Sequence, residues 1–202
     1  MSEQKSRFIK LMERAARRHN SYVVFKDFCA ITAISFYNAI FKDSAKEKEY
    51  ASIMGKYTKE EAECFPAALA VLVEAMEERV QDFLGQVYQE LGANNKAAGQ
   101  FFTPYHLCDM LVKVAVEEDD WNKRLINLIE EPSCGSGAML LPICERIRKR
   151  PETNNKFLFV AADLDITCVH MAYIQLTLCG ANAVIKHANT LTLEVYSTWP
   201  TI

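Results

Sequence analysis

A turn that follows a predicted strand carries the residues best suited to bind a ligand. Positions 130–138 read EEPSCGSGA, and the alternate glycines Gly135 and Gly137 allow the backbone to turn sharply and approach a ligand closely. The helix expected after this turn presents free N–H groups. A carboxylate such as Glu131 disfavours a phosphate but would accept hydrogen bonds from a ligand ammonium. The G-x-G-x-x-G spacing is also absent, so the pattern does not indicate a dinucleotide site.

A second acidic position lies at the end of the next predicted strand. Asp163 closes the run KFLFVAAD, where doubly wound nucleoside-binding folds place a carboxylate against ribose hydroxyls. Asp165 is the alternative ribose ligand. Either aspartate could instead serve only as the N-cap of a helix that begins near Ile166.

The first part of the chain is predicted to be helical. Apolar residues recur at helical spacing over Tyr22–Phe41 and again over Phe65–Leu91, where Pro66 suits the first turn and Gly92 the end. Positions 93–99 are small and polar and predict a linker. We therefore divide the chain into a helical N-terminal domain, 1–95, and a second domain, 96–202.

The second domain alternates strands with helices. Thr103 is expected to cap a helix that has Pro104 in its first turn and an apolar stripe formed by Leu107, Met110, Leu111 and Val114. Strands are predicted at Leu125–Glu130, Lys156–Asp163 and Val184–Asn189, with helices over about Ala138–Lys149 and over Ile166–Leu178. This order is typical of parallel βαβ units in a doubly wound α/β sheet.

Four segments, taken in order, resemble a known family. Positions 99–104, GQFFTP, look like the G-x-F-[YF]-T-P motif of N6-adenine DNA methyltransferases, and 131–137, EPSCGSG, look like their [DE]-P-x-C-G-S-G cofactor motif. Positions 159–180 are similar to the ribose-binding strand and the helix after it, and 189–191, NTL, stand where the family has G-D-[ST]-L. The helical N-terminus resembles the lead-in domain of type I modification subunits. The resemblance implies a partial Rossmann-like S-adenosylmethionine-dependent methyltransferase sheet.

The resemblance also assigns cofactor-binding roles. It implies that the methionine end of S-adenosylmethionine contacts Thr103 and Pro104, that Glu131 holds its amino group, and that Asp163 binds the ribose. The loop backbone would wrap the cofactor at Ser133, Cys134, Gly135 and Gly137, and Leu164 would pack on the adenine.

Asn189 replaces the aspartate that the family uses to bind the adenine amine. Its amide oxygen can still accept a hydrogen bond, but it carries no charge. The alternative is that Asn189 is an ordinary turn residue at a strand end. For Phe101 and Phe102, core packing is favoured over stacking on the cofactor.

The family's catalytic loop, [DN]-P-P-[FYW], has no counterpart here, because none of the six prolines are adjacent. The resemblance therefore predicts no catalytic residue within this chain and DNA contact only together with a partner chain. Without the strand that bears that loop, Leu125–Glu130 becomes an exposed apolar edge. We expect either 192–202 to cover it or another chain to do so, as self-association or as a restriction-modification subunit.

Three functions remain open. The first is the S-adenosylmethionine-binding portion of an N6-adenine DNA methyltransferase, not catalytic alone. The second is a non-catalytic regulatory or assembly module of a restriction-modification or DNA-modification system. The third is a small-molecule methyltransferase, against which the GQFFTP motif argues.

Composition limits these readings. The 202 residues, 50% hydrophobic and 24% charged, suit one core with a small accessory domain, and no apolar run of about 18 residues indicates a membrane span. Seven scattered cysteines without a C-x-x-C pair predict buried thiols in a reducing cytoplasm and no metal site. A net charge of −3 does not favour DNA binding by the chain alone. The basic clusters Arg14/Arg17/Arg18 and Arg146/Arg148/Lys149/Arg150 are predicted to be solvated helix faces or ends.

Overall fold

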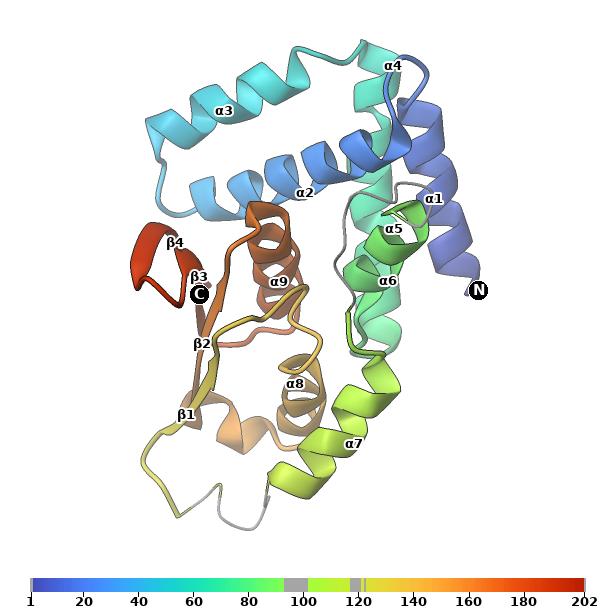
Figure 1. Cartoon of the computed structure of the whole chain (residues 1–202). Coiled ribbons are helices and arrows are strands. Elements are labelled where there is room, and N and C mark those ends of the chain that lie inside the picture. Colours follow the sequence, from blue (N-terminus) through green and yellow to red (C-terminus); the bar gives the residue numbers. More distant parts are fainter. Residues whose placement is uncertain (1, 93–101, 117–120, 122, 202) are drawn as a thin grey trace.

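The computed structural model describes residues 2–92, 102–116, 121 and 123–201 (Figure 1). The helices are α1 Glu3–Ala15, α2 Ser21–Asn38, α3 Ser44–Met54, α4 Lys59–Ala62, α5 Cys64–Glu78, α6 Phe83–Gly92, α7 Tyr105–Ala115, α8 Leu141–Arg148 and α9 Ile166–Leu178, with a short 3-10 helix at Pro151–Lys156. The strands are β1 Asn127–Glu131, β2 Phe157–Asp163, β3 Ala183–Asn189 and β4 Glu194–Pro200. Within the described ranges, no helix has the length and apolar character needed to cross a bilayer.

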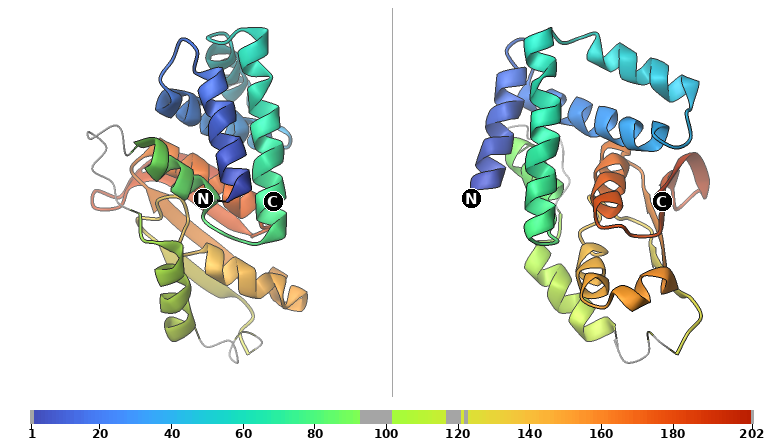
Figure 2. Two further views of the ribbon diagram at one scale, coloured as in Figure 1. Left: turned by 90° about the vertical axis from the view of Figure 1, so that its right-hand side faces the viewer. Right: turned by 180° about the vertical axis from the view of Figure 1, so that it is seen from behind.

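The strands form one sheet in the order β1-β2-β3-β4, with β1, β2 and β3 parallel and β4 antiparallel to β3. This confirms the predicted βαβ units. The described helices cover one face only, as Figure 1 and the right-hand view in Figure 2 show, and Phe157, Phe159 and Ala161 are buried on that face. The predicted α/β sheet preceded by helices is therefore confirmed, but the described helices leave its other face open, where Leu128 is 54% exposed.

The C-terminal segment does not cover the edge at β1. Positions 194–200 form β4, which pairs with β3 at the other end of the sheet, so that alternative is wrong. The physical reason is Trp199, whose buried ring packs between α2 and α9 and fixes β4 beside β3. Among the described residues, β1 pairs only with β2, and the neighbouring Leu125 is 90% exposed.

One cluster of buried side chains runs through both predicted domains. At its N-terminal end, the ring of Phe8 packs edge-on against Phe28 and Phe83, with centroids 5.0 and 5.4 Å apart. Helix α2 connects this part to the sheet by packing against α9. Because both helices are buried on nearly all sides, their sequences are apolar around the whole helix.

The helical region departs from prediction between residues 78 and 83. A single helix over Phe65–Leu91 was expected, but α5 ends at Glu78 and Arg79 adopts an extended conformation (φ −159°, ψ 148°). Side chains satisfy the backbone on both sides of the break: Gln81 Nε2 donates to the Ala75 carbonyl (3.0 Å), and Asp82 accepts from the N–H of Gly85 (3.0 Å). Local capping therefore overrides the continuous apolar pattern.

Helix α7 differs from prediction in its cap and in its buried face. Pro104, not Thr103, is the N-cap residue, and no side chain caps this end. The predicted stripe is exposed, with Val114 at 81%, whereas Cys108 and Val112 are buried. Helix α7 packs on α8, and Cys108 and Val112 are the residues that it buries. The apolar residues do recur at helical spacing, but the side of the helix that carries them is exposed.

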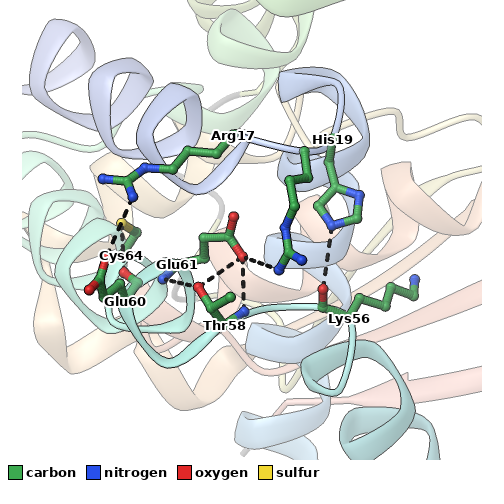
Figure 3. Close-up of polar contacts among 8 residues, drawn as sticks. Arg17, His19, Lys56, Thr58, Glu60, Glu61 and Cys64 are labelled. Carbon is green, nitrogen blue, oxygen red and sulfur yellow. Dashed lines mark hydrogen bonds and ion pairs between the residues drawn. The ribbon is translucent and has the colours of Figure 1, made fainter.

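The two basic clusters are held by acidic partners. Arg17 and Arg18 are exposed and pair with Glu60 and Glu61, which agrees with solvated helix ends. Figure 3 shows Thr58 and Glu61 in the capping box of α4, and hydrogen bonds from the Thr58 N–H and from Arg18 lower the pKa of Glu61 to about 2.

The second cluster departs from prediction at Arg146, whose side chain is buried. It donates to Asp109 of α7 (3.0 Å) and thereby ties α8 to α7. Arg146 therefore makes an internal contact between two helices, so this cluster is only in part a solvated helix face.

Candidate cofactor-binding site

The loop after β1 is a tight turn that its glycines make possible. Gly135 (φ +54°) and Gly137 (φ +89°) both adopt left-handed conformations, which favour glycine. The N–H of Cys134 donates to the carbonyl of Ala162 at the end of β2 (2.8 Å), and the N–H of Gly137 donates to the Cys134 carbonyl (2.8 Å). The turn is thus anchored to the neighbouring strand as well as to itself.

Asp163 and Asp165 have different partners. Asp163 Oδ2 accepts from the N–H of Gly135 (2.8 Å), and its Oδ1 accepts from the N–H of Asp165 (2.9 Å). Asp165 is the N-cap of α9 and accepts from the N–H of Thr167 (2.8 Å). Capping therefore accounts for Asp165, whereas Asp163 lies against the glycine loop. Ribose binding by Asp163 stays a prediction.

The ring of Phe102 packs against the glycine loop at Gly135. A Cβ added to Gly135 would lie 2.8 Å from its ring, which also lies 5.4 Å from the ring of Tyr88 in α6. This confirms packing as the role of Phe102 in the structure, whereas Phe101 and the linker 93–99 lie outside the described residues. Thr103 and Pro104 follow directly and are exposed at the start of α7.

The acidic side chains converge on the loop. Burial, and then the charges of Asp163 and Glu131, raise the pKa of the Cys134 thiol well above its usual range. Burial, and then the charges of Asp82 and Glu131, also raise the pKa of the Cys108 thiol. Six of the seven cysteines are buried, as predicted, so these thiols are not exposed nucleophiles.

An open cavity of about 450 Å³ lies beside the loop, and Glu131, Pro132, Ala162 and Asn189 contribute to its lining. Thr103, Gly135 and Asp163 do not line this cavity, so a shared pocket for the predicted residues stays a prediction. Leu164 is 61% exposed and free to pack on a ligand.

Asn189 serves as a turn residue in the structure. Its Oδ1 accepts from the N–H groups of Leu191 (3.0 Å) and Thr192 (3.2 Å). The predicted hydrogen bond from the adenine amine to this oxygen would therefore compete with the turn. Glu131 similarly accepts from the N–H of Ser133 (3.2 Å), but its second oxygen stays available.

Sequence reasoning did not find two buried polar residues behind the loop, Asp82 and Gln175. Two signals were available. Asp82 precedes Gly85 by the spacing of an N-cap. Gln175 interrupts the run MAYIQL at 171–176, which indicates a buried amide that needs hydrogen-bond partners.

Comparison with known proteins places these features in a family. The model of the N-6 DNA methylase family matches residues 79–200. The type I restriction enzyme MpnII methylase subunit of Mycoplasma pneumoniae is 24% identical over 167 residues, which cover 78% of this chain and 30% of that protein.

A crystal structure of a type I restriction-modification methyltransferase subunit from Streptococcus thermophilus matches with a TM-score of 0.46 and 20% identity, over 91% of this chain and 39% of that one. The chain thus spans about a third of the length of these relatives. Because the family model covers more than half of its residues, the chain belongs to the N-6 DNA methylase family.

Proposed function

We propose that this chain is the S-adenosylmethionine-binding portion of an N6-adenine DNA methyltransferase and does not transfer methyl groups alone. The observation that carries the proposal is the arrangement at the ends of β1 and β2. There, two carboxylates, Glu131 and Asp163, flank a loop with two left-handed glycines. A carboxylate suits the cofactor's ammonium and a second suits its ribose diol, while the glycine backbone allows close approach.

The residues present fit the cofactor. Glu131 would hold the amino group, Asp163 would accept from the ribose hydroxyls, and Leu164 would cover the adenine. Both Asp163 oxygens already accept one backbone N–H each, and each oxygen can accept a second hydrogen bond. S-adenosylmethionine supplies the methyl group when bound, and the chain's own residues orient it.

Methyl transfer requires a group that holds the target adenine, and this is where the chain needs a partner. The adenine-holding N-P-P-F-like sequence is not among the 202 residues, and the net charge of −3 gives little attraction for DNA. We therefore propose that DNA is bound and methylated only together with another polypeptide segment or subunit.

The first test is stabilisation by S-adenosylhomocysteine, the reaction product, measured by thermal unfolding. If the ligand binds only the folded state, a concentration of 100 times Kd adds about 2.7 kcal/mol. For a chain of this size, this shifts the melting temperature by about 5–10 °C. The same protein, incubated with labelled S-adenosylmethionine and unmethylated genomic DNA, is expected to leave adenine N6 unlabelled.

Two outcomes would contradict the proposal. No shift at millimolar ligand would mean that the loop keeps the shape of a cofactor site without its function, and a non-catalytic assembly module would then be the better description. Labelled adenine above the level of a Glu131→Ala control would show that the chain is catalytic alone.

The edge at β1 favours assembly with another protein in either case. On the side away from β2, β1 pairs with no strand of the described residues, and the apolar residues Leu125, Ile126 and Leu128, in or next to this strand, are exposed. We propose that this edge binds a second copy of the chain or a restriction-modification subunit. Light scattering of the chain should show concentration-dependent association that Leu128→Lys weakens and that Val114→Lys on α7 leaves unchanged. A strict monomer at high concentration, with slow hydrogen exchange in β1, would count against it.

A further inference from the structure

A buried polar network connects α6 to the glycine loop. The Asp82 side chain is 3% exposed, and the side chains of Ser136 and Gln175 are fully buried. Asp82 Oδ1 accepts from the N–H of Gly85 (3.0 Å), as the N-cap of α6, and from Nε2 of Gln175 (3.1 Å). One carboxylate therefore fixes both the start of α6 and an amide on α9.

Gln175 carries the connection on to the loop. Its Nε2 also donates to the carbonyl of Ser136 (2.8 Å), the residue between the two left-handed glycines, and its Oε1 accepts from the N–H of Leu84 in α6 (3.0 Å). Both hydrogens and the oxygen of the Gln175 amide therefore have hydrogen-bond partners. The side chain can adopt only one orientation that satisfies all three partners.

Gly85 allows the close approach on which the network depends. A Cβ at this position would overlap the carboxylate of Asp82 and the hydroxyl of Ser136. Helix α6 therefore lies against the inner side of the loop, where only a residue without a side chain fits. On the outer side, the loop is held by Asp163 through the N–H of Gly135 (2.8 Å).

We propose that Asp82 and Gln175 are positioning residues for the cofactor loop, through which helix α6 sets the conformation of Gly135–Gly137. The inference rests on the proposed function for the identity of the ligand, but the loop conformation can be measured without one. It makes the break between α5 and α6 a functional feature of the helical region.

The ionisation of Asp82 gives the network a pH signature. Burial raises the pKa of Asp82, against hydrogen bonds from Gln175 and Gly85. Among the described residues, the Cys108 thiol of α7 is a titratable group whose pKa the charge of Asp82 raises. An aspartate with a raised folded-state pKa stabilises the folded state below its unfolded-state pKa, and this contribution is lost as pH rises through the folded-state pKa. The free energy of unfolding should therefore fall over that window, and Asp82→Asn should remove this fall.

The test compares Asp82→Ala and Asp82→Asn in the full chain. Asparagine keeps an acceptor for Gly85 and Gln175, whereas alanine removes the acceptor of the Gly85 N–H and of one of the two Gln175 amide hydrogens. We expect Asp82→Ala to weaken S-adenosylhomocysteine binding by about tenfold or more in calorimetry, and Asp82→Asn to bind like the wild type. In the ligand-free protein, hydrogen exchange at Gly135 and Gly137 should accelerate in Asp82→Ala only.

Asp43→Ala is the matched control. Asp43 caps α3 through the N–H groups of Ala45 and Lys46, with the same chemistry, but it lies outside the network. It should leave loop exchange and ligand affinity unchanged, so a change in both variants would mean that lost stability alone explains the effect and would overturn the proposal. Wild-type loop exchange and affinity in Asp82→Ala would overturn it too, as would an Asp82→Asn variant as impaired as Asp82→Ala.

Gln175→Glu decides the matter if Asp82→Ala does not fold. The new carboxyl group would face the carboxyl group of Asp82. A hydrogen bond between the two can form only when one of them is protonated. In this variant, the affinity for S-adenosylhomocysteine should therefore increase, and hydrogen exchange at Gly135 and Gly137 should slow, as the pH is lowered from 8 to about 6. A variant whose affinity and exchange equal those of the wild type at every pH would overturn the proposal. If the wild type binds no S-adenosylhomocysteine, the proposed function fails, while loop exchange still tests the positioning role.

Discussion

Trp199→Ala is expected to destabilise the protein by about 3–5 kcal/mol, the range for removing a buried large aromatic side chain. The ring is 2% exposed and lies 5.4 Å from Tyr37 of α2, 4.8 Å from His170 and 5.6 Å from Tyr173 of α9. Lys46 Nζ lies 3.7 Å from the ring centroid, a cation–π contact. Alanine would remove all of these contacts from the side chain that connects β4 to α2 and α9.

Urea denaturation followed by circular dichroism measures this change. Trp199→Phe should lower the free energy of unfolding by less than half as much as Trp199→Ala, because it keeps an aromatic ring in the same space. Tyr196→Ala is the control on the same strand, since its side chain is 52% exposed, and it should change stability by no more than about 1 kcal/mol. A Trp199→Ala variant as stable as Tyr196→Ala would show that β4 is not anchored through this ring.

The position of β4 was not predictable from local sequence. Positions 194–200, EVYSTWP, contain several residues that favour strands, but their pairing with β3 depends on the long-range contacts of Trp199. By contrast, the bounds of α9 were predicted correctly, because Asp165 caps its start and Gly180, at φ +66°, follows its end. Local caps and turn glycines can be read from a sequence, but tertiary partners cannot.

The residues of the candidate site also divide into those that local sequence predicts and those that depend on tertiary contacts. The glycine turn and the separate position of Asp163 were visible in the sequence because each has a local signature. The apolar stripe of α7 was also visible, yet its exposure depends on which helices pack against it. Asp82 and Gln175 meet across 93 positions of the chain, so no local pattern could pair them.

Asp163→Ala is expected to weaken S-adenosylhomocysteine binding by about 100-fold, the equivalent of two hydrogen bonds to a charged group. It removes the acceptor that we propose for the ribose and also the contact that holds the N–H of Gly135. Asp165→Ala should instead cost about 1 kcal/mol of stability through loss of the α9 cap, with little change in affinity. The pair is matched, because the two aspartates are two positions apart and undergo the same substitution.

Isothermal titration of the chain with S-adenosylhomocysteine measures the proposed cofactor binding itself, because it reports affinity and stoichiometry without methyl transfer. We expect one site per chain in the wild type and in Asp165→Ala, and binding at least about 100-fold weaker in Asp163→Ala. Unfolding measurements on the ligand-free variants show that each is folded during the titration. No binding by the wild type, or equal affinity in Asp163→Ala and the wild type, would contradict a cofactor site between Glu131 and Asp163.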